Sequence, residues 1–250
     1  MNVDQQVRRG PVQRLGVWLL WAVVLELLIV LTSLPGLLGL LFLDLSRPGH
    51  VPLAALCLVP LGPSLAAAVF AWNRLSATPR GAPGLAPAAT FWRGYHLNLR
   101  DVLRWWVPVL AVLAALGYAM ADAGLVFGDA EPGSVGAASL VYLVLAVTLV
   151  LWSVEALLLT ALFSFRTRDI AKLAAYYLGA RPLATLGLLG ALVTAAAVVL
   201  FSGVVVLMPL LSLTALLLVA AARPVIDDAT ERFVVPDQRS GNGEPTADLA

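Results

Sequence analysis

The sequence has few charged residues. Charged side chains make up 12% and hydrophobic side chains 60% of its 250 residues, whereas soluble domains carry about 25% charged residues. The apolar residues also lie in long uncharged blocks that a single water-soluble core of this size could not bury. The composition therefore excludes an ordinary soluble globule and predicts a membrane protein.

Cysteine and histidine are almost absent. The single cysteine, Cys57, excludes an intrachain disulfide, and His50 and His96 are too few to form a metal site with it. The motifs of nucleotide-binding loops, zinc proteases and serine hydrolases are also missing. These absences predict a protein that is not an enzyme and has no cofactor. The formal net charge of +1 gives no reason to expect a nucleic-acid partner.

Five apolar blocks carry at most one charge each. They cover residues 15–43, 51–73, 105–128, 137–165 and 182–222. A bilayer core of about 30 Å needs about 20 helical residues, so each of the first four blocks predicts one span. The last block is about twice that length. Its length favours two spans with a break between Ser202 and Pro209 over one long tilted helix.

The predicted fold class is all-α, a polytopic bundle of six transmembrane helices with two cytoplasmic interfacial amphipathic helices. The predicted spans are residues 15–34, 52–73, 105–127, 137–164, 183–202 and 205–222. Together they form one transmembrane domain over residues 15–222. It lies between a cytoplasmic segment, residues 1–14, and a cytoplasmic tail, residues 223–250, that has the composition of disorder.

The basic residues predict the orientation of the spans. With a cytoplasmic N-terminus and six spans, Arg47 alone lies outside, and the other 15 of the 16 basic residues lie on the cytoplasmic side. Short cytoplasmic loops carry the excess of basic residues in membrane proteins. Both termini are therefore predicted to be cytoplasmic.

Two cytoplasmic segments beside the spans have an amphipathic pattern. In residues 91–104 the apolar and basic positions fall on opposite sides of a helix, and residues 166–181 repeat this pattern. Both predict short helices parallel to the membrane plane. They form a candidate surface for lipid or for a docked partner subunit, made of Phe91, Trp92, Arg93, Tyr95, Asn98, Arg100, Arg104, Arg168 and Lys172.

Two acids lie deep within predicted spans, Glu26 near the middle of the first and Glu155 in the fourth. A charge at the bilayer centre costs at least about 2.5 kcal/mol, so each acid needs a partner, water or a proton. They form a candidate intramembrane polar site, in which we expect them to be protonated or hydrogen-bonded to each other. The site is either a proton-coupled or substrate-binding site, or a pair of protonated carboxyls bonded to hydroxyls of neighbouring helices.

Several short motifs resemble those of one family. They are FWRGYHLN at residues 91–98, PLGPSLAAA at 60–68, SLP at 33–35 and FR at 165–166, before the second amphipathic segment. These motifs are similar to those of the YesL-like bacterial integral membrane proteins, a domain of unknown function, over about residues 15–222. The resemblance implies the bacterial plasma membrane and an accessory role in carbohydrate uptake by ABC importers.

Three classes of function are consistent with these features. The first is a non-catalytic accessory or regulatory subunit, whose partners are membrane lipid and the permease subunits of an ABC importer. The alternative is a small transporter that uses Glu26 and Glu155, and a membrane-embedded enzyme fits least. The sequence leaves the oligomeric state open.

Overall fold

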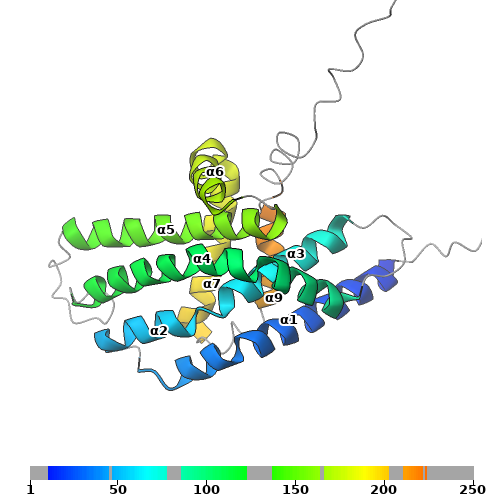
Figure 1. The fold of residues 1–250 in the computed structure, drawn as a ribbon, viewed down its shortest axis with the longest axis horizontal. Helices are drawn as coiled ribbons and strands as arrows, with labels where there is room; N and C mark the ends of the chain where they lie inside the picture. The colour runs from blue at the N-terminus through cyan, green and yellow to red at the C-terminus, as the bar shows by residue number, and fades with distance from the viewer. Residues whose placement is uncertain are drawn as a thin grey trace, which may run out of the picture.

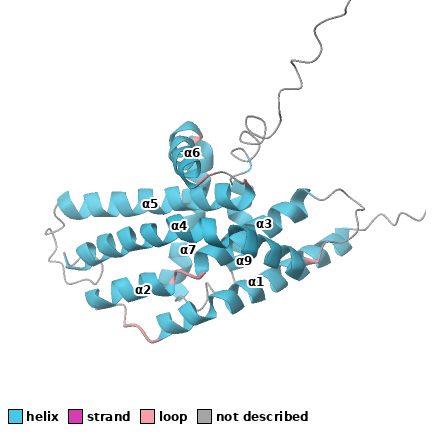
Figure 2. Ribbon diagram, in the orientation of Figure 1, coloured by secondary structure: helices cyan, strands magenta, loops and turns pink. Residues whose placement is uncertain are grey.

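Helices make up the part of the chain that the computed structural model describes, residues 11–44, 47–77, 86–122, 137–163, 166–202, 211–221 and 223. These residues form eight α-helices and one 3-10 helix and contain no strand (Figure 1, Figure 2). The elements are α1 Pro11–Leu41, η1 Pro48–His50, α2 Val51–Cys57, α3 Leu61–Ala77, α4 Pro87–Asp122, α5 Ala137–Leu162, α6 Thr167–Ala180, α7 Pro182–Ser202 and α9 Leu211–Ala221. The prediction of an all-α protein is confirmed for the described residues.

Three helices are long and apolar enough to cross a membrane. They are α1 over Leu15–Leu41, α4 over Pro87–Ala121 and α5 over Leu140–Leu162. Two bent pairs raise the number to five if each pair is one span: η1 and α2 with α3, bent by 42°, and α6 with α7, bent by 99°. Many large apolar side chains of these helices are exposed, as expected where lipid is the solvent. These are the features of an integral membrane protein.

Helix α3 lies at the centre of the bundle. It packs against α1, α4, α5 and α9. Figure 1 shows α5, α4 and the pair of α1 and α2 running along the long axis, while α7 and α9 cross behind them. Its buried positions include many small residues: Gly62, Ser64, Ala66, Ala67, Ala68 and Ala71. Small side chains let helices approach closely in a membrane, where packing and hydrogen bonds hold them together.

The predicted second span, residues 52–73, is not one continuous helix. Helix α2 ends at Cys57 and α3 begins at Leu61, so the prediction of an unbroken helix is wrong here. Pro60 has no N–H group to continue the hydrogen bonds of α2, and its ring disfavours helical geometry at Val59. The proline therefore divides the span into two shorter helices.

Helix α1 extends beyond the predicted limits of residues 15 and 34. It begins at Pro11 and continues through Pro35 to Leu41. A proline is well accommodated at a helix start because the N–H it lacks would have no partner there. The part after Pro35 packs closely on α2, since a Cβ added at Gly36 or Gly39 would collide with Cys57. This packing holds the end of α1 in helical form despite the hydrogen bond that Pro35 removes.

The predicted interfacial helix of residues 91–104 is not a separate element. It is the first half of α4, one helix of 36 residues without a break before Trp105. The prediction of a short helix parallel to the membrane is therefore wrong for this segment. A change from charged to apolar residues alters the surroundings of a helix but not its backbone, and no glycine or proline lies between Leu97 and Val107.

The other helices follow the predicted segments more closely. Helix α5 agrees with the predicted span of residues 137–164, and residues 166–181 form a separate helix, α6. Helix α7 ends at Ser202 and α9 begins at Leu211. The predicted break between the last two spans falls outside the described residues. So do residues 1–10 of the predicted N-terminal segment, the loop of residues 123–136 and the predicted disordered tail after residue 223.

Candidate functional site

Glu26 lies in the middle of α1 and reaches the first turn of α9. Its Oε2 accepts a hydrogen bond from the backbone N–H of Ser212 at an N···O distance of 2.7 Å. The first N–H groups of a helix have no partner within the helix and carry the positive end of its dipole. Glu26 therefore supplies, from another helix, the acceptor that a capping side chain supplies at an ordinary helix start.

Trp72 of α3 completes this contact between helices. Its indole Nε1 donates a hydrogen bond to the carbonyl oxygen of Ser212 at 3.0 Å. The centroid of its ring lies 5.5 Å from that of Trp18 and 6.4 Å from that of Trp21. An acid, a backbone amide and a group of indoles thus join α1, α3 and α9 at one place.

Two buried atoms at this junction have no hydrogen-bond partner among the described residues. They are Oε1 of Glu26 and Oγ of Ser212. A carboxylate oxygen accepts hydrogen bonds, and a hydroxyl can donate or accept. The junction can therefore take up a proton or a water molecule in addition to the bond that it already makes.

Glu155 of α5 is fully buried, with 0% of its surface exposed. Within the described part of the chain, neither of its carboxyl oxygens has a hydrogen-bond partner. The predicted hydrogen bond between Glu26 and Glu155 is therefore wrong. Helix α3 packs against both α1 and α5, whereas α1 and α5 have at most a weak contact with each other. Sequence spacing cannot reveal this, because it does not show which helix occupies the centre of the bundle.

A cluster of hydroxyl groups that the sequence analysis did not identify joins α1 to α3. The oxygens of Thr32 and Ser64 are 2.8 Å apart, and Ser33 donates a hydrogen bond to Ser64 at 3.1 Å. Ser64 in turn donates to the carbonyl oxygen of Pro60 at 2.8 Å. The cluster therefore lies beside the break between α2 and α3, where backbone carbonyls lack their helical partners.

Trp106 of α4 provides a partner for the broken backbone. Its indole Nε1 donates a hydrogen bond to the carbonyl oxygen of Leu58 at 3.1 Å. An unpaired carbonyl costs several kcal/mol in lipid, so breaks in membrane helices are found where neighbouring groups satisfy them. The indole lies directly on Gly62, where an added Cβ would come within 2.7 Å of the ring. Pro60 and Pro63 give a sequence signal for the break, but nothing in the sequence points to Trp106 as its partner.

Most of the predicted surface residues are exposed. The exposed ones are Trp92, Arg93, Arg100, Arg104, Arg168 and Lys172, and Tyr95 is half-buried. The prediction is wrong for Phe91 and Asn98, which are buried. A Cβ added at Gly94 would come within 2.8 Å of the Phe70 ring, so α4 approaches α3 closely on the side that carries them. The Asn98 side chain donates a hydrogen bond to the Gly94 carbonyl at 2.9 Å rather than facing a partner.

The comparisons with known proteins add no assignment to this geometry. Within the described residues, no group of three or more histidine, cysteine, aspartate or glutamate side chains could hold a metal ion. The resemblance to the YesL-like proteins stays a prediction. No protein-family model, no curated protein and no solved structure matches the chain.

Proposed function

We propose that the protein is a six-span protein of the bacterial plasma membrane and a non-catalytic accessory or regulatory subunit of an ABC-type carbohydrate importer. The observation that carries this proposal is α6, which packs on the bundle with one side and exposes basic and aromatic side chains on the other. The assignment to carbohydrate uptake rests on the resemblance to the YesL-like family alone.

Helix α6 is held firmly against the rest of the molecule. Its buried residues are Ile170, Ala174 and Tyr177, which recur at helical spacing and form one face. Trp152 of α5 donates a hydrogen bond from its indole to the Ala171 carbonyl at 3.2 Å. The position of α6 relative to α5 is therefore fixed by packing and by a hydrogen bond.

The opposite side of α6 is suited to a protein partner. Arg168 and Lys172 are exposed, and 55% of the Tyr176 surface is accessible. Figure 1 shows α6 at the edge of the bundle, beside α5 and viewed nearly along its axis. Interfaces are enriched in tyrosine and arginine, and a preformed helix loses little entropy on binding. This side fits an acidic segment on the cytoplasmic side of a permease.

The six proposed spans combine helices and sequence. Helix α1, the broken helix of η1, α2 and α3, and helices α4 and α5 supply four. Helices α7 and α9 supply the last two, together with the residues between them. In this arrangement α6 and the first half of α4 lie on the cytoplasmic side with most of the arginines, in agreement with the rule that positive residues stay inside.

Purification from native membranes tests this function. We expect permease subunits of an ABC importer to co-purify with the wild-type protein after mild solubilisation. The variant Arg168→Gln/Lys172→Gln should recover about tenfold less permease, because two charges at the edge of an interface contribute about 1–2 kcal/mol. Arg47→Gln, which lies on the predicted outer side, is the control and should recover as much permease as the wild type. Absence of permease in all preparations, even after crosslinking in the membrane, would contradict the proposal.

A small transporter is the second candidate, and the broken second span favours it. Transporters often bind substrates or ions where a membrane helix is interrupted near the bilayer midplane. Here the break at Pro60 lies beside the hydroxyls of Thr32, Ser33 and Ser64, and Glu26 lies on the same helix as two of them. Uptake of a sugar by proteoliposomes that contain only this protein would favour the transporter over the accessory subunit.

A further inference from the structure

A basic stripe runs along the exposed side of the first half of α4. Arg93, Leu97, Arg100 and Arg104 recur at intervals of four, three and four residues, and all four are exposed. This spacing places them on one face of the helix. The stripe lies opposite the face that packs into the bundle, so it contacts whatever surrounds the protein at this level.

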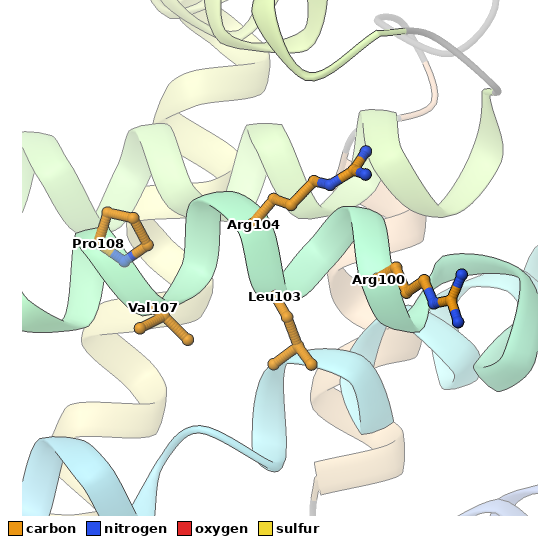
Figure 3. A pocket seen from close by; sticks show the side chains of 5 residues that line it. All are labelled: Arg100, Leu103, Arg104, Val107 and Pro108. Atoms are coloured by element: carbon orange, nitrogen blue, oxygen red, sulfur yellow. The ribbon is translucent and has the colours of Figure 1, made fainter.

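The stripe ends at an open hollow on the surface of α4. The hollow is lined by Arg100, Leu103, Arg104, Val107 and Pro108. In Figure 3 the guanidinium groups of both arginines extend toward the N-terminal half of the helix, away from Pro108. The hollow is therefore cationic at one end and apolar at the other.

The positive charge at the cationic end is only partly compensated. Nη1 of Arg104 lies 3.2 Å from Oδ1 of Asp101, and both side chains are largely exposed. An exposed pair of this kind contributes little, because water and salt screen it. One acid beside two arginines leaves a net positive charge, and guanidinium groups bind phosphate oxygens through paired hydrogen bonds.

The apolar end favours a lipid over a free phosphate as the ligand. Val107 is 44% exposed, and the exposed side of α4 continues with apolar Val112 and with Tyr118. Arginine side chains at the end of a span extend toward the headgroups while their stems cover apolar surface. The hollow thus lies where a headgroup and the first part of an acyl chain would meet the helix.

We propose that this hollow binds one anionic phospholipid of the cytoplasmic leaflet. The phosphate lies between Arg100 and Arg104, and an acyl chain lies along Leu103, Val107 and Pro108. The inference rests on the proposed orientation of α4 in the membrane. The bound lipid covers apolar side chains that the protein leaves exposed and fixes the depth of α4 in the bilayer.

Native mass spectrometry of the full-length protein tests the site. The protein is released from nanodiscs with equal amounts of phosphatidylglycerol and phosphatidylcholine, and the retained lipid is identified. Two arginines near a headgroup correspond to about a thirtyfold preference for the anionic lipid. We expect this preference for the wild type, its loss in Arg100→Gln/Arg104→Gln, and its partial retention in Arg100→Lys/Arg104→Lys. The control Arg93→Gln/Arg168→Gln removes the same charge outside the hollow and should keep the preference.

Several outcomes would overturn the lipid site. They are equal retention of both lipids by the wild type, an unchanged preference in Arg100→Gln/Arg104→Gln, displacement of the lipid by inorganic phosphate alone, and occupation of this face by a second copy of the chain. Labelling of Asp101→Cys in a Cys57→Ser background tests the orientation separately. Labelling from the cytoplasmic side without a lipid preference overturns the lipid site alone, whereas labelling from the outer side overturns the proposed topology.

Discussion

Replacing Glu155 with leucine is expected to make the protein more stable. The side chain is fully buried, and neither carboxyl oxygen has a hydrogen-bond partner among the described residues. Burying a polar group without a hydrogen bond costs about 1–3 kcal/mol by the measure of protein mutations. Leucine has a similar size and removes this cost, so Glu155→Leu should raise the free energy of unfolding by about that amount. Thermal unfolding in detergent measures the change.

Two matched variants make this result specific. Glu155→Gln keeps a buried polar group without a partner, so its stability should stay close to that of the wild type. Glu26→Leu removes the acceptor of the Ser212 N–H bond and leaves that amide unpaired, so it should lower stability by about 1–3 kcal/mol. A loss of stability in Glu155→Leu equal to that in Glu26→Leu would show that Glu155 has a partner and that its burial is compensated.

Gly36→Ala is expected to separate α1 from α2. A Cβ at this position would overlap the backbone carbonyl of Cys57, and one at Gly39 would lie 2.6 Å from the Cys57 sulfur. Both atoms at Gly36 belong to backbone, so no rotation of a side chain can relieve the contact. Overpacking of this kind costs about 1–3 kcal/mol or more. The variant should therefore unfold at a lower temperature.

The chain contains its own reporter for this separation, because Cys57 is its only cysteine. When α2 moves away from α1, the thiol becomes more accessible, and we expect a maleimide to label it several times faster than in the wild type. Gly16→Ala is the control on the same helix, since an added Cβ there meets nothing within 4 Å. An unchanged labelling rate and stability in Gly36→Ala would show that α1 and α2 do not pack as described.

The helical class and the apolar segments could be predicted because both are properties of the chain read in one direction. Runs of uncharged residues of sufficient length are required wherever a helix crosses lipid. The effect of a proline could not be predicted in the same way. Pro60 ends a helix, whereas Pro35 and Pro108 lie inside helices. The difference depends on the neighbours that satisfy or compensate the lost hydrogen bond, such as Trp106 beside Leu58.

The candidate site was predicted in part. The two intramembrane acids could be found because a carboxyl in an apolar block is costly and therefore rare. Their partners could not be found, because Glu26 bonds a backbone amide 186 residues away, and backbone amides carry no mark in a sequence. The pairing of Glu26 with Glu155 was wrong because it assumed that two acids at similar depth must meet. The buried positions of Phe91 and Asn98 could not be inferred from an aromatic-rich motif, since the packing of α4 on α3 decides them.

The number of membrane crossings is the central claim, and reporter fusions test it most directly. Fusions after Arg80, Gly133, Lys172 and Arg239 place a reporter in each of four segments between or after the proposed spans. Six spans with a cytoplasmic N-terminus predict readings of inside, outside, inside and inside, because α7 and α9 cross as a pair. An outside reading at Arg239 with the other three unchanged would leave five spans and contradict the proposed fold of the last block.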